Sequence, residues 1–558
     1  MNKIKLLVFI GICISFFTSV AQESTQNAID VSKNIQYSEF SKHLEYLSSD
    51  ELKGRDTGSE GYAQAADYVG NELKELGMLP FGDDNTYFQK IPLNKRYLIK
   101  SSLKVEAQLN GEKVEGIYGE NISLVFNPSY DEVNTEQELV FVGYGNVFPE
   151  DNINDYKDVD VKGKTVIVVL GAPKGMDNKL AIDPFLKITN AVKNGASGII
   201  LFLPNSKLIQ GFVFKQLHGY LSAPMITLDD TSTAKSVFDF NMQIAGLTKK
   251  ELIKDIFKLN GLNLKKELKK IKKGNSASIS LASKIHCSYN IKQEKISCKN
   301  VVALLPGSDP TLKNEYLVMG AHLDHLGIGA EVKGDSIYNG MWDNASGSAA
   351  IISMAKAYTE LENKPNRSVV FVCYTGEEKG LLGSNYYANN NNIEDGKIIA
   401  NLNIDMLGNL FETKDIIPMG YSHSNLSEAV DFAANTLNLQ IDDNKQEEIE
   451  YLERSDQISF IKNEIPALNI GSGYTALDPK INATKETTKW MKKTYHSPFD
   501  DLNQDYSPES FLTYIQVNFL TSYYITHKMG EIKWNEESWV YQKYVYKEPE
   551  NKEVTETK

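Results

Sequence analysis

Three apolar runs of strand length decide the fold of this chain: Tyr316-Leu-Val-Met319, Ser368-Val-Val-Phe-Val-Cys373 and Ile398-Ile-Ala-Asn-Leu-Asn-Ile404. Between the first two runs, Asp343-Asn-Ala-Ser-Gly347 opens a helical stretch at 349–358. Continuous apolar strands that alternate with helices are typical of a parallel sheet covered by helices on both faces. We therefore expect an α/β domain built on such a sheet.

Polar residues able to bind a metal ion follow each of these runs at once. His322-Leu-Asp324-His325 follows the first run, Glu377-Glu378 the second and Asp405 the third. Ligands of parallel sheets bind beyond the carboxyl ends of the strands, where these side chains would meet. The sequence therefore predicts a metal site at this edge of the sheet.

Length and composition are those of a large globular protein. At 558 residues the chain is too long for a single core, so two or three domains are expected. Its hydrophobic content of 41% is ordinary, and its net charge is −14. That negative charge argues against a broad surface for nucleic acid or for anionic membranes.

Residues 1–21 have the pattern of a secretory signal peptide. The basic start Met1-Asn-Lys-Ile-Lys5 precedes an apolar run at 6–17, and Ser19-Val-Ala21 supplies the small residues that a signal peptidase reads. The apolar run is too short for a membrane span, so we expect export to the periplasm or the extracellular space. Cys13 lies in this run without a convincing lipobox, and a lipid anchor is kept only as the alternative.

Three cysteines remain in the expected mature chain. Cys373 lies in an apolar run and is predicted to be a buried thiol. Cys287 and Cys298 flank a predicted hairpin in an oxidising compartment. Two alternatives stay open for this pair, a disulfide or two free thiols, because spacing alone does not determine the geometry.

Five residues together form a set that can hold two metal ions. Each group alone has an ordinary explanation, such as a helix N-cap for the Asp-Asn turn or a solvated face for the Glu pair. Together they supply two imidazoles and three carboxylates, which suits two zinc ions about 3.5–4 Å apart if one carboxylate bridges them. The set is His322, Asp343, Glu378, Asp405 and His496. Glu377 is then left beside the metals, where it can act as a general base.

Longer motifs surround these residues. They are Gly320-Ala-His-Leu-Asp-His-Leu-Gly327, Asp343-Asn-Ala-Ser-Gly347, Phe371-Val-Cys-Tyr-Thr-Gly-Glu-Glu-Lys-Gly-Leu-Leu-Gly-Ser384, Asn401-Leu-Asn-Ile-Asp-Met-Leu-Gly408, Arg454-Ser-Asp-Gln457 and Tyr495-His-Ser-Pro498. In this order they resemble the motifs of the M28 zinc aminopeptidases, and the resemblance covers most of 30–118 and 290–530. It implies a zinc-dependent exopeptidase fold, α/β with a mixed, mainly parallel sheet and helices on both faces, and two zinc ions acting on peptide substrates.

The resemblance also implies a role for each candidate ligand. Asp343 would bridge the two metals. Glu378 and His496 would complete one ion, and His322 and Asp405 the other.

Three further residues would serve the reaction in such a family. Glu377 would be the general base on a metal-bridging water, Asp324 would orient His322, and Tyr495 would stabilise the oxyanion. The family also implies a cis peptide bond between Asp343 and Asn344.

Four other residues near the candidate ligands each have a structural explanation as well as a functional one. Arg454 and Asp456 either hold the substrate or brace their loop. Trp342 either narrows the pocket or packs against it. His325 is expected to support the site rather than bind metal, because the five ligands already serve both ions.

Residues 119–288 are predicted to form an inserted, β-rich domain. Gly143-Tyr-Gly145, Asp160-Val-Lys-Gly-Lys-Thr-Val166, Asn190-Ala-Val-Lys-Asn-Gly-Ala196 and Ala223-Pro224 resemble a protease-associated (PA) domain. The segment lacks a clustered ligand set, so we expect it to act as a lid or spacer. The other predicted parts are a discontinuous peptidase domain at 22–118 and 289–530, and a charged C-terminal extension at 531–558.

The function expected from these observations is that of an exported dizinc aminopeptidase. Two alternatives remain open. One is a glutaminyl-cyclase-like enzyme with one zinc ion, against which His322 and Asp405 argue as a second metal set. The other is a non-catalytic, receptor-like binding ectodomain, which would lack ligands or the base, and none is missing here.

Overall fold

The computed structural model contains two compact units, one formed by Met1–Pro92 with Ser297–Lys558 and one formed by Leu93–Ile296. Both boundaries fall inside strands, β2 (Phe88–Leu98) and β13 (Ile279–Leu305), so each strand gives residues to both units. The predicted signal peptide lies outside the residues that the structure describes. These are residues 23–127, 130–148, 152–173, 183–204, 214–215, 217–219, 221–229, 242–274, 278–442 and 451–547.

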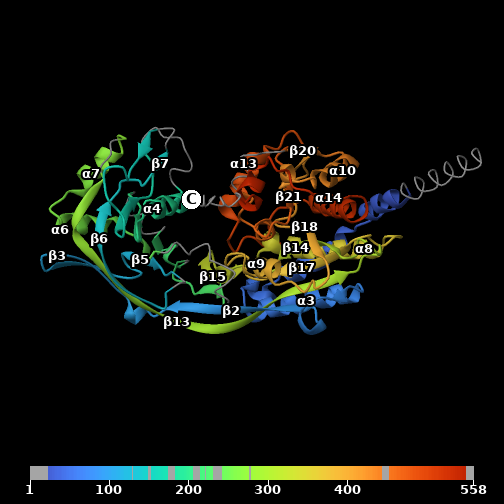
Figure 1. Ribbon diagram of the computed structural model, residues 1–558, viewed down its shortest axis with the longest axis horizontal. Helices are drawn as coiled ribbons and strands as arrows, with labels where there is room; N and C mark the ends of the chain where they lie inside the picture. Colours follow the sequence, from blue (N-terminus) through green and yellow to red (C-terminus); the bar gives the residue numbers. More distant parts are fainter. Residues whose placement is uncertain are drawn as a thin grey trace, which may run out of the picture. The chain divides into compact units, whose positions relative to one another are not determined.

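The first unit is built on a sheet with a parallel centre (Figure 1). Besides β13, its strands are β1 (Leu79–Pro80), β14 (Glu315–His322), β17 (Ser368–Tyr374), β18 (Lys397–Asn403), β19 (Asp415–Met419), β20 (Gln440–Ile441) and β21 (Ala467–Ser472). β17, β14, β18 and β21 pair in that order, all parallel. β13 pairs antiparallel with β17, and β19 pairs antiparallel with β21. The mixed, mainly parallel sheet is therefore confirmed.

Helices surround this sheet, and several begin at a polar cap. Ser507 accepts a hydrogen bond from Ser510 N ahead of α14, with Pro508 in the first turn, and Ser59 accepts one from Tyr62 N ahead of α3. The helices are α2 (Tyr37–Leu47), α3 (Glu60–Glu75), α8 (Ser346–Thr359), α9 (Leu382–Asn389), α10 (Ser427–Leu437), α12 (Gln457–Ile461), α13 (Ala483–Lys493) and α14 (Pro508–His527). The short elements are η1 (Asp50–Arg55), η2 (Asp83–Asn85), η6 (Met341–Ala345), η7 (Tyr421–His423), η8 (Tyr541–Val545), and the hairpin β15 (Gly327–Val332) and β16 (Asp335–Tyr338).

Successive side chains of β17 show how helices cover both faces of the sheet. Val370 belongs to a buried cluster with Tyr387 of α9 and Phe460 of α12. Phe371, one position further, contacts Tyr358 of α8 with ring centroids 6.0 Å apart. Successive side chains of a strand point to opposite faces. The apolar run that predicted this strand is thus buried on both sides.

The predicted C-terminal extension is packed along part of its length. Val540 is fully buried, and Trp534, Trp539 and Tyr544 pack against the same cluster as β17. These apolar side chains continue the core beyond residue 530. Residues 548–558 lie outside the described part of the chain.

The second unit is β-rich. Its strands pair in the order β4, β3, β13, β6, β9, β10, β12, β5, and β6, β9, β10 and β12 run parallel. β11 pairs with β2, and β7 with β8. The elements are β3 (Lys104–Leu109), β4 (Glu112–Gly116), β5 (Ile122–Val125), β6 (Glu132–Phe141), β7 (Val147–Phe148), β8 (Ile153–Asn154), β9 (Thr165–Val169), β10 (Gly198–Phe202), β11 (Met225–Leu228), β12 (Ile244–Thr248), η3 (Lys100–Ser102), α4 (Pro184–Lys193), α6 (Lys250–Leu259) and α7 (Leu264–Ile271).

This unit is longer than the inserted domain predicted at 119–288. It begins at Leu93 and ends at Ile296. β3 and β4 precede residue 119, but β3 pairs with β13 inside the unit, so they belong to its sheet. The resemblance to a PA domain stays a prediction.

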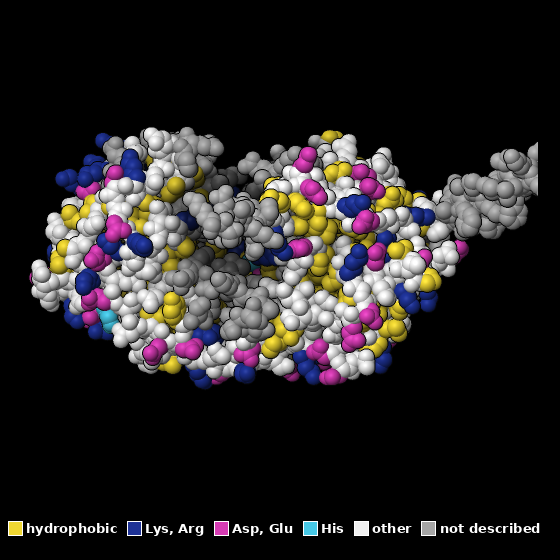
Figure 2. All heavy atoms as spheres, viewed as in Figure 1, with side chains coloured by type: hydrophobic (Ala, Val, Ile, Leu, Met, Phe, Trp, Pro, Cys, Tyr) yellow, Lys and Arg dark blue, Asp and Glu magenta, His cyan; other side chains and the backbone are white. Residues whose placement is uncertain are grey.

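Helices α6 and α7 place their apolar side chains in the core of the second unit. Ile256 and Phe257 of α6 and Leu264 and Ile271 of α7 are buried. The lysines of α7 are exposed, and Figure 2 shows lysine and arginine side chains over this helix. Among the described residues, no helix combines the length and the apolar character needed to span a membrane.

Of the two alternatives left open for Cys287 and Cys298, the structure shows the free thiols. Cys287 and Cys298 are both buried free thiols, as Cys373 is. The predicted hairpin between the first two is one continuous strand, β13. Because a strand rises by about 3.3 Å per residue, two cysteines eleven positions apart along it are far beyond disulfide range.

Candidate metal centre

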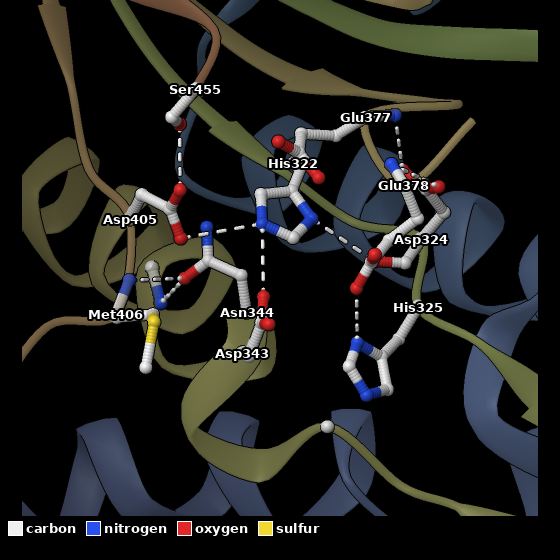
Figure 3. A network of polar contacts seen from close by, with 12 residues as sticks. His322, Asp324, His325, Asp343, Asn344, Glu377, Glu378, Asp405, Met406 and Ser455 are labelled. Atoms are coloured by element: carbon white, nitrogen blue, oxygen red, sulfur yellow. Dashed lines mark hydrogen bonds and ion pairs between the residues drawn. The ribbon is translucent and has the colours of Figure 1, made fainter. Parts of the chain in front are cut away.

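The predicted ligands come from the carboxyl ends of three neighbouring parallel strands. His322 is the last residue of β14, Glu377 and Glu378 follow β17, and Asp405 follows β18. Because β14 pairs parallel with both β17 and β18, these strand ends lie side by side. Their side chains gather around His322 in Figure 3.

Asp343 enters the site from the turn ahead of α8. The peptide bond between Asp343 and Asn344 is cis, which confirms the prediction. Asn344 Nδ2 donates to the carbonyl of Ile404 (2.9 Å), and Asn344 Oδ1 accepts from the N–H of Gly347 (2.9 Å). One amide side chain thus ties the turn both to the end of β18 and to the start of α8.

The two oxygens of Asp343 face different histidines. Asp343 Oδ1 lies 3.2 Å from His322 Nε2, and Asp343 Oδ2 lies 3.1 Å from His496 Nε2. Beyond them, His322 Nε2 lies 3.3 Å from Asp405 Oδ1, and His496 Nε2 lies 3.4 Å from Glu378 Oε1. The five predicted ligands therefore form two sets that share one carboxylate.

Glu377 lies close to the first of these sets. The ligand atoms of His322, Glu377 and Asp405 are all within 4.8 Å of one another. Burial raises the pKa of Glu377 well above its ordinary value, although the nearby His322 opposes this shift. A carboxyl with a raised pKa binds a proton readily, which suits a general base.

His325 lies beside the second set. Its Nδ1 is 2.7 Å from Glu378 Oε1, and its side chain is fully buried. Ligand atoms of His325, Asp343 and Glu378 also lie within 4.8 Å of one another. The residue expected to support the site therefore touches a ligand directly and lies within ligand range itself.

The charges of the site favour a bound cation. Burial would lower the pKa of both histidines, but Glu377 and Asp405 raise that of His322 well above its usual range. Glu378 and Asp343 likewise raise the pKa of His496 to about 11. The carboxylates thus hold positive charge on both imidazoles, which must be neutral to bind a metal. Divalent ions would supply that charge, and this nitrogen and oxygen donor set fits zinc.

Asp324 supports the loop after β17 with its carboxylate. Oδ1 accepts from the N–H of Glu377 (3.1 Å), and Oδ2 accepts from the N–H of Glu378 (3.4 Å) and from Thr57 Oγ1 (2.9 Å). His322 Nδ1 lies 3.0 Å from the backbone oxygen of Asp324. The contact that orients the imidazole therefore comes from the carbonyl rather than from the carboxylate.

Two aromatic residues lie next to the ligands. Tyr495 stacks on His496 with ring centroids 3.9 Å apart. Burial, with added repulsion from nearby carboxylates, raises the pKa of Tyr495, so its hydroxyl keeps its proton and can donate. Trp342 is buried and packs edge-on against Trp490, with ring centroids 4.6 Å apart. Of the two explanations for Trp342, the structure thus shows that its ring packs against a neighbouring side chain.

The two tentative substrate residues lie in different surroundings. Arg454 is exposed, and its guanidinium lies 5.0 Å from the ring of Tyr451. Asp456 is fully buried, and burial raises the pKa of its carboxyl to about 7. Between them, Ser455 donates to Asp405 Oδ2 (2.6 Å). Sequence reasoning missed this serine, although it lies inside a motif that was singled out.

Comparison with known proteins finds similar sequences around these residues. Residues 300–520 match the family model described as Peptidase family M28. Leucine aminopeptidase 2 of Arthroderma otae is 23% identical over 490 residues, which cover 86% of this chain and 81% of that protein. Aminopeptidase Y of Saccharomyces cerevisiae is 30% identical over 226 residues, 39% of this chain, and this match spans only 37% of the yeast protein.

A solved structure shows a similar fold. The aminopeptidase from Aneurinibacillus sp. strain AM-1 matches 90% of this chain and 97% of its own, with 18% identity and a TM-score of 0.52. All five candidate ligands and Glu377 lie within the residues that the family model matches. Residues 300–520 of the chain thus match peptidase family M28, and the comparisons support a metallopeptidase.

Proposed function

We propose that the chain is an exported aminopeptidase that uses two zinc ions. The observation that carries this proposal is the position of Asp343, whose two oxygens face His322 on one side and His496 on the other. A carboxylate shared in this way is the central ligand of a two-metal site. The relatives named above as aminopeptidases support the same reaction.

Each residue near the metal ions would serve a different step of the hydrolysis. When bound, the zinc ions would polarise the scissile carbonyl and lower the pKa of water. Glu377 accepts the proton that the attacking water loses and delivers it to the leaving amine. Tyr495 donates its hydroxyl proton in a hydrogen bond to the oxygen on which negative charge develops. The carboxylates attract the free N-terminal amine, which limits cleavage to the end of the peptide.

Metal content tests the proposal directly. Purified protein should contain about two zinc equivalents, and chelation should abolish the hydrolysis of an aminoacyl substrate. Asp405→Ala should lower the zinc content because it removes a ligand of one ion. An N-acetylated substrate should not be cleaved. One ion at saturation in the wild type would contradict the proposal and favour the single-zinc cyclase, and no metal would favour a binding ectodomain.

Export and the inserted unit belong to the same proposal. The apolar segment at 6–17 and Ser19-Val-Ala21 support cleavage after residue 21, and the intact mass of the periplasmic or secreted protein measures this. A full-length mass in the cytoplasm would contradict it. The second unit would act as a PA-like lid or spacer.

A further inference from the structure

Three consecutive backbone N–H groups ahead of α8 donate to one buried residue, Asp500. The N–H of Met341 donates to the backbone oxygen of Asp500 (2.9 Å). The N–H of Trp342 donates to Asp500 Oδ1 (2.9 Å), and that of Asp343 to Asp500 Oδ2 (3.0 Å). Buried amides without a partner are costly. Asp500 is therefore what holds the backbone that carries the shared carboxylate.

The backbone carbonyls just before this turn accept hydrogen bonds from the buried guanidinium of Arg55. Arg55 Nη1 donates to the carbonyl of Asn339 (2.6 Å), and Arg55 Nη2 donates to that of Gly340 (3.0 Å). Arg55 Nε donates to the carbonyl of Leu323 (2.8 Å), the residue after His322. The arginine thus joins the loop of one histidine ligand to the turn of Asp343.

Arg55 and Asp500 act on opposite ends of the same short segment, residues 339–343. The guanidinium of Arg55 holds its first two carbonyls, and the carboxylate of Asp500 holds its last two amides, so the charges match the peptide dipoles. Both side chains are fully buried. Burial lowers the pKa of Arg55 to about 10, and among the opposing charges Asp500 raises it most. The two residues are therefore electrostatically coupled across the segment.

Asp500 is itself fixed by the loop of another ligand. It lies four residues after His496, and its Oδ1 accepts from Gln504 Nε2 (2.5 Å). Gln504 Oε1 in turn accepts from Trp490 Nε1 (2.5 Å). The position of the anion thus depends on side chains of α13 and of the loop that carries His496.

We infer that Arg55 and Asp500 form a two-sided clamp that positions the Asp343 carboxylate between the two metal ions. The inference rests on the proposed dizinc site. Neither side chain is a predicted ligand, so both are positioning residues. Loss of such support typically costs ~10–100-fold in metal affinity or activity.

Asp500→Asn is the main test, because it keeps the size of the side chain and turns one of the two acceptors into a donor. We expect zinc transfer to a chelator to become ~10–100-fold faster. The visible absorption of the cobalt-substituted protein should change as well, because it reports the coordination geometry. Asp501→Asn, at the adjacent position with partial exposure, is the matched control and should behave as wild type.

Arg55→Lys is the milder second variant, which keeps the charge but loses the planar fork of donors. It should change zinc release in the same direction, while Lys53→Gln at an exposed neighbouring position should not. The double variant should release zinc little faster than the worse single variant, because both changes free the same segment. Fully multiplicative effects would mean that the two residues act independently, and would overturn the clamp.

Two results separate this inference from the proposed function. If the wild type holds two ions but both variants keep its zinc release and cobalt spectrum, the clamp is wrong and the dizinc site stands. The same holds if the variants only melt at a lower temperature while the spectrum of the folded protein is unchanged. If the wild type does not hold two ions, the proposed function itself fails.

Discussion

Buried charge is used differently in the two units of the chain. In the second unit, the fully buried ammonium of Lys187 donates to three neutral oxygens, those of Tyr144 (2.6 Å), Asn146 (3.0 Å) and Gly171 (3.3 Å). In the first unit, buried carboxylates gather around two histidines, His322 at the end of β14 and His496 after α13. A single charge satisfied by dipoles can support a fold, whereas crowded like charges need a cation. The comparison predicts that charge changes alter chemistry in one unit and stability in the other.

The largest effect is expected at Glu377. Glu377→Gln keeps the shape of the side chain but removes the proton acceptor, so turnover should fall by ~10²–10⁴-fold with zinc content unchanged. The matched variant Glu378→Gln should instead lower the zinc content, because Glu378 belongs to the ligand set. Steady-state kinetics and metal analysis of the two variants measure this division. Near-normal turnover in Glu377→Gln would remove the catalytic assignment.

A smaller effect on chemistry is expected at Tyr495. Tyr495→Phe removes only the hydroxyl, so kcat should fall by ~10²–10³-fold while zinc content and KM change little. The raised pKa of Tyr495 keeps the hydroxyl protonated at neutral pH, so the loss should be similar across neutral pH. Tyr546→Phe, at an exposed position, is the control. A main effect on KM would assign Tyr495 to substrate binding.

The strand-end ligands could be predicted because two local signals coincide there. His322 and Asp405 follow apolar runs that form neighbouring parallel strands, and parallel strands bring their carboxyl ends to one edge. The cis bond before Asn344 and the role of Tyr495 came only from the resemblance to a family. Pattern and family together thus predict which side chains gather in the candidate ligand cluster.

Arg55 and Asp500 could not be predicted in this way. Both act on backbone N–H or C=O groups of distant segments, and such contacts leave no spacing or residue-type signal in the sequence. The supposed hairpin between Cys287 and Cys298 failed for a related reason. Alternation indicates a strand, but it does not reveal whether the strand turns back or continues, as β13 does.

The smallest effect on chemistry is expected at Lys187, and the effect there should be on stability. Lys187→Met keeps most of the side-chain volume but removes the donor from three oxygens, two of them in buried contacts, which should cost about 1–3 kcal/mol of unfolding free energy at neutral pH. Denaturant unfolding measures the loss. Turnover of a small aminoacyl substrate should stay unchanged, in contrast to Glu377→Gln. Lys193→Met, at an exposed position on the same helix, is the control.

The pH dependence of stability tests the same charge independently. Burial lowers the pKa of Lys187 to about 8, whereas the pKa of a lysine in an unfolded chain is ~10.4. Between these values the unfolded chain binds more protons than the folded chain, so this group makes the unfolding free energy rise with pH. Below about pH 8 both states are protonated and its contribution is constant. Lys187→Met should therefore show a smaller rise from pH 8 to 10 than Lys193→Met. Two outcomes would contradict the structural role of Lys187. One is an equal rise of unfolding free energy with pH in the two variants, and the other is a loss of turnover without a loss of stability.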